Sequence, residues 1–476
     1  MSKADPAPRP RDLTPEEFRE WGHRFVDWVA DYLAHPERLD VLSKAAPGAV
    51  RRRLSPTPPE RGEPLEAVLR DMTDVIVPGL THWNHPGFFA YFPTTGSGPG
   101  ILGELVAAAF NVNGMLWRTS PAATELEELV LDWLRQMMGL PGAFKGFVYD
   151  TASISTLHAL IAARQAVDGL HAREDGVGGG APRLRMYASS EAHSSVEKDA
   201  IAIGIGRRGL VKIDVDTEFR MYPAALEEAI VKDRERGYRP FCVVATMGTT
   251  STTSVDPVPA IAAIAQRYGL WLHIDAAYAG SAAILPEMRP MFAGMDQADS
   301  IVMNPHKWLF TPMDFSAFFC RRPDVLKEAF SLVPDYLKTP ETDVTNTMDY
   351  GLQLGRRFRA LKFWMVVRYF GVEGLQNAIR EHMRLGRLFR SWVEADPRFE
   401  IMAPTAFSTV CFRLRADDAA NQALLDRVNA SGRIFLSHTR LLGKLTLRFT
   451  VGNLRSDEEQ VQMAWELVCR DGKGLS

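Results

Sequence analysis

The chain has 476 residues, 46% hydrophobic and 24% charged, which is typical of globular proteins of roughly two to four domains. Its net charge of −3 is small for this length, so we expect no broad basic surface and no nucleic-acid partner. The four cysteines form no Cys-x-x-Cys pair, which argues against a metal site. The sequence lacks an apolar run of roughly 18 residues and a secretory-type start, so we expect a cytoplasmic protein without a membrane segment.

The first 95 residues are predicted to be largely helical. "TPEE" at 14–17 is a helix-start signature, and the apolar and aromatic residues of 18–32 recur at helical spacing. So aromatic a stripe needs a partner surface, either the body of the chain or a second subunit. The segment 46–64 predicts an extended linker, and another helix is expected at 64–80. We interpret residues 1–95 as a helical dimerisation segment.

Helical and strand patterns alternate between residues 95 and 320. The expected helices are 101–110, 122–138, 153–168, 194–204, 222–236 and 257–268. The expected strands are 185–189, 210–214, 241–246, 271–275, 300–304 and 315–320. This alternation predicts an α/β domain over 96–370, with a mostly parallel central sheet covered by helices on both faces.

The sequence changes character after this domain. Residues 331–350 are polar and aperiodic, which is typical of a lid loop. A helix at 372–394, followed by strands at 408–415 and 444–451, then predicts a small C-terminal α+β domain over 371–476.

Several side chains that can do chemistry follow the predicted strands. Asp275 ends "WLHID", and Lys307 follows "SIVMNPH" about one crossover later. Ligands of open α/β sheets bind outside the carboxyl ends of the strands, so these two groups can face one crevice. His193 follows another strand, and Ser153 begins a helix. Each residue alone is also typical of an ordinary turn, cap or surface position, but the combination is harder to explain that way.

This combination suits pyridoxal phosphate (PLP). A lysine amine forms a Schiff base with its aldehyde, and a carboxylate keeps its pyridine nitrogen protonated. A helix N-terminus binds its phosphate, and a flat side chain stacks on its ring. A free lysine keeps its proton up to about pH 10.4, but desolvation lowers that value and an imine removes the ammonium. We therefore predict that Lys307 carries the cofactor.

A collinear series of motifs supports the same conclusion. "NPHKW" and "WLHIDAAYAGSA" resemble the group II pyridoxal-phosphate decarboxylases, in particular the aromatic L-amino acid decarboxylase branch. Further matches are "THWNHPGFFAYFPTTGS", "SPAATELEELVLDWL", "SSEAHSSVEK", "VATMGTTSTTSVDP", "LGRRFRALKFW", "DPRFEI" and "VCFRL". The resemblance covers nearly the whole chain. It implies a fold-type I, aspartate aminotransferase-like enzyme that acts as a homodimer, with each active site at the subunit interface.

The resemblance also implies roles for individual residues. Lys307 would bind PLP covalently, Asp275 would pair with the ring nitrogen, and His193 would stack on the ring. Ala277 would pack beside the ring and Thr250 would lie near its hydroxyl. The phosphate would be held by Ala152, Ser153 and Asn304. The substrate would be contacted by Thr94, His306, Trp83, Tyr91, Phe92, Met115 and Arg356. Tyr336, in the polar loop, would return a proton to the substrate carbon.

Some positions depart from the pattern of animal relatives. Asp150 and Thr151 replace the glycine and serine at the start of the phosphate turn, and Ile154 replaces a glutamate. In the segment expected from the partner subunit, Asn113 and Met115 replace isoleucine and phenylalanine. A flexible thioether and an amide make that wall more adaptable and more polar. These changes concern the substrate rather than the cofactor.

The resulting hypothesis is decarboxylation of aromatic L-amino acids to amines and carbon dioxide. A competing hypothesis is an aldehyde synthase, which also deaminates oxidatively; in this family that outcome accompanies loss of the tyrosine or histidine found here as Tyr336 and His193. Three further hypotheses are decarboxylation of a non-aromatic amino acid, a PLP enzyme of another class such as an aminotransferase, and an inactive homologue that serves as a scaffold.

Overall fold

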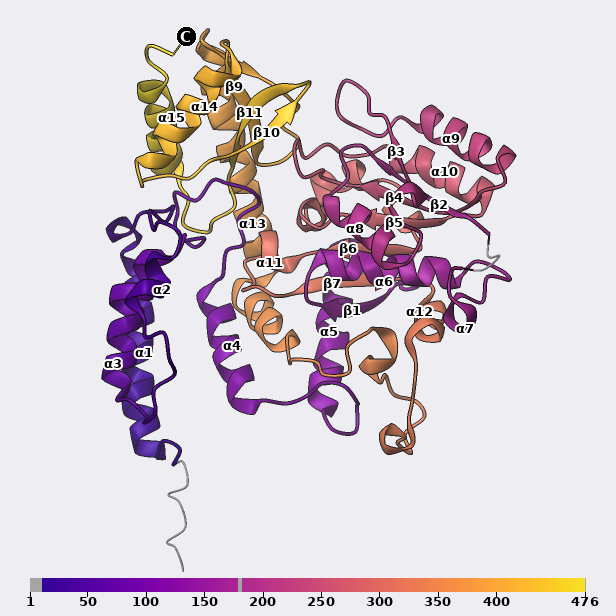
Figure 1. Cartoon of the computed structure of the whole chain (residues 1–476), viewed down its shortest axis with the longest axis horizontal. Coiled ribbons are helices and arrows are strands. Elements are labelled where there is room, and N and C mark those ends of the chain that lie inside the picture. The colour runs from indigo at the N-terminus through magenta and orange to yellow at the C-terminus, as the bar shows by residue number, and fades with distance from the viewer. Residues whose placement is uncertain (1–10, 179–181, 476) are drawn as a thin grey trace, which may run out of the picture. The chain divides into compact units, whose positions relative to one another are not determined.

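The computed structural model of the chain describes residues 11–178 and 182–475 (Figure 1). The first ten residues, which bear on the expected absence of a secretory signal, lie outside this range. The chain forms two compact units, Met1–His85 and Pro86–Ser476. No helix in the described ranges has the length and apolarity needed to cross a membrane. The predicted boundaries at 95/96 and 370/371 stay predictions.

The N-terminal unit is helical, as expected. Its main helix α1 (Pro15–Ala34) begins with a capping box, in which Thr14 and Glu17 each accept a hydrogen bond from the other's backbone N–H. None of its side chains is fully buried, but its aromatic stripe is partly covered within this unit. The Trp28 indole N–H donates to Thr73 Oγ1 at 3.1 Å, and the Tyr32 ring packs against His82 at 5.7 Å. The remaining elements are η1 (Pro36–Arg38), α2 (Ala49–Arg53), α3 (Leu65–Asp71), η2 (Met72–Ile76) and η3 (Val77–Gly79).

The prediction of an extended linker over 46–64 is wrong at its start, where α2 forms one short helix. Gly48 precedes this helix with φ of 79°, a left-handed conformation that glycine adopts without steric cost. The alanine and arginines that follow are good helix formers, and the prediction of a linker gave them too little weight.

The second unit contains a seven-stranded sheet among its described residues, in the order β1-β7-β6-β5-β4-β2-β3. The strands are β1 (Lys145–Tyr149), β2 (Leu184–Ser189), β3 (Leu210–Ile213), β4 (Arg239–Thr246), β5 (Trp271–Asp275), β6 (Ser300–Met303) and β7 (Ser316–Cys320). β7 is antiparallel to both β1 and β6, and the other pairs are parallel. The predicted mostly parallel sheet is therefore confirmed.

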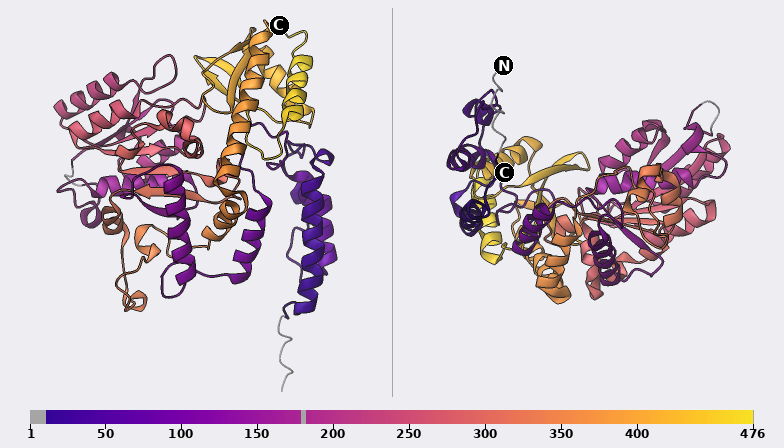
Figure 2. Two further views of the ribbon diagram at one scale, coloured as in Figure 1. Left: turned by 180° about the vertical axis from the view of Figure 1, so that it is seen from behind. Right: turned by 90° about the horizontal axis from the view of Figure 1, so that it is seen from below.

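Helices cover both faces of this sheet, as predicted (Figures 1 and 2). Alternate residues of β4 enter different cores: Val244 packs in the core that includes α6 (Ala152–Gln165) and α8 (Ser194–Ala202). Val243 packs in the opposite core, which includes α5 (Pro121–Met137), α9 (Pro223–Glu235) and α10 (Val258–Tyr268). This two-sided burial explains why the strands are nearly continuous apolar runs.

A smaller antiparallel sheet lies in the C-terminal part, in the order β10-β11-β9-β8. Its strands are β8 (Phe399–Ile401), β9 (Thr409–Leu414), β10 (Ser437–Leu441) and β11 (Lys444–Thr450), with helices α14 (Asp418–Ala430) and α15 (Glu458–Asp471). The long helix α13 (Ala360–Ala395) precedes it and breaks at Gly371, where φ is 66° and ψ is 171°. The helix expected at 372–394 is the second part of α13.

The remaining elements are short or connect the larger ones. They are α4 (Gly98–Phe110), α7 (Ala172–Asp175), η4 (Arg207–Gly209), η5 (Ala279–Ile284), η6 (Pro286–Phe292), η7 (Met295–Gln297), α11 (Pro305–Trp308), α12 (Pro323–Phe330), η8 (Asp335–Leu337) and η9 (Thr347–Tyr350). The predicted lid segment 331–350 thus contains two short 3₁₀ turns and no long helix.

A buried ion pair joins α5 to the segment before α13. The Arg356 guanidinium donates to Glu127 Oε1 at 2.7 Å and to the Val148 carbonyl at 2.6 Å, while Glu127 Oε1 also accepts from the Val148 N–H. Both side chains are less than a tenth exposed. Because each charge compensates the other away from water, removal of either one leaves an unpaired buried charge.

We expect Glu127→Ala to destabilise the protein by about 3–5 kcal/mol, because Arg356 would stay buried without its partner. Glu128→Ala is the matched control, since Glu128 follows on the same helix but is 43% exposed and its ion pair with Lys145 spans 3.6 Å. Its loss should cost at most about 1 kcal/mol. Denaturant midpoints of the two variants and the parent check this, and equal small losses would contradict it.

Candidate active site

Lys307 lies on α11, directly after the buried strand β6. The Asn304 N–H donates to the Ala277 carbonyl at 3.0 Å, which joins the end of β6 to the segment that follows β5. Pro305 then starts the short helix, and the Lys307 N–H donates to the Asn304 carbonyl at 2.9 Å. The Lys307 side chain is half-buried, and its Nζ lies 5.5 Å from the centre of the Phe92 ring.

Stacked rings hold α11 in place. Trp308 is fully buried and stacks on Tyr278, whose ring stacks in turn on Phe92, with centroid separations of 4.7 and 3.9 Å. The Trp308 indole N–H donates to His382 Nδ1 at 2.9 Å. Aromatic packing of this kind anchors a backbone strongly. The tryptophan therefore fixes the helix, while the neighbouring lysine remains available for chemistry.

Asp275 ends β5, the strand next to β6, and is 6% exposed. Its Oδ1 accepts from the Ala277 N–H at 3.0 Å. Burial lowers the pKa of Lys307, and the negative charge of Asp275 opposes that shift. Lys307 and Asp275 therefore lie close enough for their charges to interact, and burial makes the lysine easier to deprotonate than in water.

His193 is the N-cap residue of α8. Its Nδ1 accepts from the Ser195 N–H at 3.2 Å and lies 2.8 Å from Ser195 Oγ. Partial desolvation lowers the pKa of His193, with Asp275 raising it and Lys307 lowering it further. The histidine therefore belongs to the same electrostatic cluster as Lys307 and Asp275. It is neutral near pH 7, which leaves a flat, uncharged ring for stacking.

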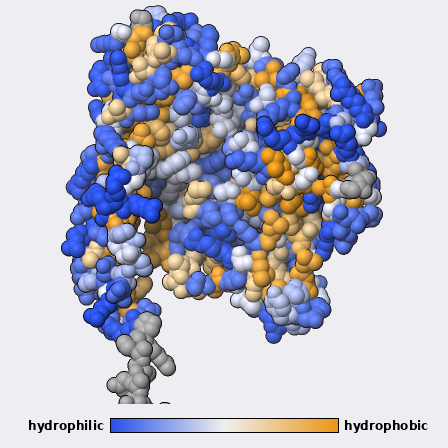
Figure 3. Space-filling model, viewed as in Figure 1, coloured by the Kyte–Doolittle hydropathy of each residue, from blue (hydrophilic) through white to orange (hydrophobic). Residues whose placement is uncertain are grey.

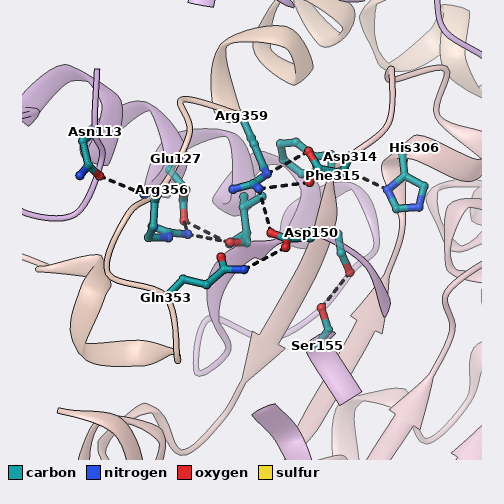
Figure 4. Close-up of polar contacts among 12 residues, drawn as sticks. Asn113, Glu127, Asp150, Ser155, His306, Asp314, Phe315, Gln353, Arg356 and Arg359 are labelled. Atoms are coloured by element: carbon teal, nitrogen blue, oxygen red, sulfur yellow. Dashed lines mark hydrogen bonds and ion pairs between the residues drawn. The ribbon is translucent and has the colours of Figure 1, made fainter. Parts of the chain in front are cut away.

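The predicted phosphate-binding residues lie at the start of α6, after β1. Thr151, the N-cap residue, makes no side-chain cap, so the backbone N–H groups of Ala152 and Ser153 are not capped by it. Asp150 points to Arg359 and Gln353, which donate to it at 2.8 and 2.9 Å (Figure 4). The carboxylate that replaces the family's glycine is thereby paired with a cation.

His306 and Asn304 flank the lysine. His306 is buried and its Nδ1 accepts from the Phe315 N–H at 2.9 Å (Figure 4), while burial lowers the pKa of His306 to about 3. It is therefore a neutral histidine whose remaining nitrogen can carry a proton. Asn304 Oδ1 and Thr246 Oγ1 are buried and have no hydrogen-bond partner among the described residues. Unsatisfied buried polar atoms beside a lysine with a lowered pKa fit a pocket shaped for a polar cofactor.

The structure does not place every predicted site residue in this pocket. Tyr336 lies on η8 and its side chain is 78% exposed. Met115 packs against a small cluster of Leu116, Leu337 and Met348. Arg356 forms the buried ion pair with Glu127, and Trp83 belongs to the N-terminal unit. Contacts of these four residues with substrate stay predictions.

Three further predicted residues are at least partly exposed. Thr94 is half-buried, and Thr250 is exposed in the turn after β4. Tyr91 has φ of 52°, is 51% exposed, and packs edge-on against Phe435 at 5.9 Å. Their roles toward cofactor and substrate also stay predictions.

Arg448, on β11, was missed in the sequence. Its guanidinium lies 5.3 Å from the centre of the Phe92 ring, and it donates to the Ser251 carbonyl at 2.9 Å and to Ser437 Oγ at 3.1 Å. Its Nη2 is buried and has no partner within the described part of the chain. The sequence did contain an indication of this role, because Arg448 lies within the largely apolar strand "KLTLRFT". A charged residue that such a strand buries needs a partner or a function.

Comparison with known proteins identifies the family. The family model described as "Pyridoxal-dependent decarboxylase conserved domain" matches residues 47–415. An aromatic-L-amino-acid decarboxylase of Catharanthus roseus is 39% identical over 96% of this chain and 94% of its own length. A phenylacetaldehyde synthase of Arabidopsis thaliana is 41% identical over 98% of each chain.

A solved structure is similarly close. The crystal structure of Oryza sativa TDC with PLP and tryptamine superposes with a TM-score of 0.94 at 38% identity, over 98% of this chain and 99% of the other. The predicted fold-type I architecture is therefore confirmed. The family model, the relatives and this fold together show that the chain belongs to the pyridoxal-dependent decarboxylases.

Proposed function

We propose that this protein is a carboxy-lyase that uses PLP to decarboxylate aromatic L-amino acids to the corresponding amines. The observation that carries the proposal is the electrostatic interaction of Lys307 with Asp275, which follow and end neighbouring strands, within a chain of this family. Relatives named as aromatic-L-amino-acid and tryptophan decarboxylases support the substrate class. PLP, when bound, supplies an electron sink for the bond between the substrate's Cα and its carboxylate.

Different residues of this chain bind different parts of the cofactor. Lys307 would hold the cofactor covalently and would be released as a free amine when the substrate amine takes its place, which its lowered pKa favours. Asp275 would pair with the pyridine nitrogen of PLP, and the His193 imidazole would stack on one face of the pyridine ring. Ala152 and Ser153 at the start of α6, with Asn304, hold the phosphate. Thr250 lies near the ring hydroxyl and Ala277 packs beside the ring.

The substrate is bound by an aromatic pocket. Phe92, with Tyr91 and the flexible Met115, supplies apolar surface for the substrate ring. Thr94 and His306 lie near the substrate carboxylate, where a neutral histidine adds no charge of its own. Arg448 places a cation beside Phe92, so an acidic amino acid is a meaningful competitor in a substrate test.

Purified enzyme given PLP should release amine from phenylalanine, tyrosine, dihydroxyphenylalanine or tryptophan at least tenfold faster than from glutamate or histidine, because the pocket offers aromatic surface. Lys307→Ala should abolish turnover and the visible absorbance of lysine-bound cofactor. Amine detection by chromatography checks both. Multiple turnovers by Lys307→Ala, or a preference for glutamate, would contradict the proposal.

An aldehyde synthase is the second candidate, and a specific finding favours it: one close relative is named phenylacetaldehyde synthase. Tyr336 and His193 argue for simple decarboxylation, because a proton delivered to Cα ends the reaction at the amine. Tyr336 lies in the segment 331–346, which we propose closes over the substrate to exclude water and bring the phenol to Cα.

Tyr336→Phe removes that proton donor, and we expect it to lower amine production at least tenfold. With dissolved oxygen as the oxidant and water supplying the aldehyde oxygen, the variant should yield aldehyde, ammonia and peroxide. Peroxide and carbon dioxide measured in the same reaction test this. Tyr350→Phe serves as a control, because Tyr350 stacks on Phe147 at 4.5 Å and has no proposed catalytic role. Peroxide formed by the parent enzyme in step with carbon dioxide would favour the aldehyde synthase.

We also propose that the protein is a cytoplasmic homodimer whose two active sites each draw on both chains. Helix α1 exposes Phe18 and Val26, and α4 exposes Leu102, Leu105, Val106 and Phe110. Figure 3 colours the apolar residues at the molecular surface orange. Apolar surfaces of this kind mark association sites, and twofold dimers are the commonest homo-oligomers.

Phe110→Glu should therefore shift the protein toward monomer and lower activity with it, because a charge would be buried at the contact. Val231→Glu is the control, since Val231 is an exposed apolar residue of α9. Sedimentation velocity at several concentrations measures the outcome. A dimer unaffected by Phe110→Glu would place the contact elsewhere.

A further inference from the structure

A second carboxyl group is buried near the Asp275 pocket. Asp199 lies on α8, the helix capped by His193, and is 7% exposed. It follows Ser195, which contacts His193, by one helical turn on the same face. The side chains of Val196 and Ala200 beside it pack in the core that also contains Val244 of β4 and Trp271 of β5. Asp199 therefore faces the sheet from the α8 side.

Asp275 projects to this same side of the sheet. Thr246 lies two residues after Val244 on β4, so the two side chains share one face, the face that α8 covers. Thr246 is directly opposite Asp275 in the parallel register of β4 and β5, which places both on that face. The topology thus puts Asp199, Thr246 and Asp275 in one layer, between α8 and the carboxyl end of the sheet.

This layer contains unsatisfied polar atoms. Asp199 Oδ2 and Thr246 Oγ1 are both buried, and neither has a hydrogen-bond partner among the residues described. An ionised carboxylate without a partner is costly to bury. Burial accordingly raises the pKa of Asp199 to about 7, with the charge of Asp275 adding to the increase and Lys198 opposing it.

The other charged and titratable groups around this layer are few. On α8 itself, Lys198 acts on Asp199, while Glu197 pairs with Arg207 and Lys212 outside the core. On α6, the Arg164 guanidinium donates to the Ile203 carbonyl at 2.7 Å. On the pocket side, three groups interact with Asp275, namely His193, Lys307 and His273.

We propose that Asp199 is a positioning residue that acts through Asp275: a second ionisable carboxyl in the same layer, whose loss of a proton strengthens the hold of Asp275 on the protonated ring nitrogen of PLP. The proposal rests on the proposed function, in which Asp275 pairs with that nitrogen. When Asp199 is ionised, the potential at the ring nitrogen becomes more negative and its positive charge is stabilised. When Asp199 is neutral, Asp275 acts alone.

The test is the affinity of the apoenzyme for PLP, followed by quenching of tryptophan fluorescence at pH 6 and pH 8. PLP has titrations of its own, so the informative quantity is the ratio of the two dissociation constants in each protein. The dissociation constant at pH 6 divided by that at pH 8 should be about fivefold to tenfold larger in the parent than in Asp199→Asn, because the asparagine cannot ionise. Equal ratios in the two proteins would overturn the proposal.

If the role of Asp199 is purely structural, Asp199→Asn should weaken PLP binding by the same factor at pH 6 and pH 8. The ratio of dissociation constants would then equal that of the parent, which would overturn the proposal. Glu197→Gln is the matched control, since it removes a carboxylate from the outer side of the same helix, and its ratio should equal that of the parent. Asp199→Ala gives a second variant without the carboxyl and should behave as Asp199→Asn does.

Asp275→Asn separates this inference from the function on which it rests. Retained PLP affinity in that variant would show that Asp275 is not the cofactor's partner, and the proposed site would fail. Lost affinity in Asp275→Asn, combined with a parent-like ratio in Asp199→Asn, would overturn the role of Asp199 alone.

Unfolding provides an independent readout. The folded-state pKa of Asp199 lies above its value of about 3.9 in an unfolded chain, so its ionisation destabilises the folded state as pH rises from about 4 through 7. Apoprotein carrying Asp199→Asn should therefore unfold at a higher temperature than the parent at pH 8, with the difference shrinking toward pH 5. An identical difference at both pH values would show that Asp199 does not titrate there.

Discussion

The arrangement of the active site depends on one ammonium group that is held where water is scarce. Lys307 is placed by the stacked rings of Trp308, Tyr278 and Phe92, which fix its short helix without using the lysine itself. Burial lowers the pKa of Lys307 because the charged amine loses its hydration, and the negative charge of Asp275 on the next strand partly offsets that decrease. The balance between desolvation and one opposite charge leaves an amine that loses its proton more readily than a lysine in water.

The remaining pocket groups are kept neutral or paired. His306 accepts a backbone hydrogen bond and stays uncharged, and Asp150 is neutralised by Arg359, which also contacts Asp314 at 3.1 Å. Such pairing limits the net charge near the site to groups that have a part in binding or proton transfer. Asp199 Oδ2 and Arg448 Nη2 differ, since both are buried without a partner among the described residues, and the Arg448 guanidinium lies beside the Phe92 ring.

The sequence alone predicted the sheet, most helices and the association of Lys307 with Asp275, because strand periodicity and the crevice rule for α/β sheets are local and general. The helix α2 was not predicted, because the prolines around it indicated an extended linker despite its run of good helix formers. Arg448 and Asp199 were also missed, because a single charged residue in an apolar element reveals its surroundings only after the element is packed. Tyr336 could be named only from the family resemblance, because its exposed position on η8 makes no contact that sequence patterns could anticipate.

The antiparallel strand β7 acts as a spacer between β6 and β1. Neighbouring strands are separated by about 4.8 Å, so the lysine after β6 and the helix that begins after β1 are offset by about 10 Å across the sheet. Because β7 runs in reverse, its first residue, Ser316, lies at this edge and its hydroxyl is 2.8 Å from Ser155 on α6. The strand spacing thus fixes the distance between the lysine after β6 and the start of the helix after β1. Insertion or deletion of one strand would change that distance by about 4.8 Å, so a ligand that contacts both points would no longer fit.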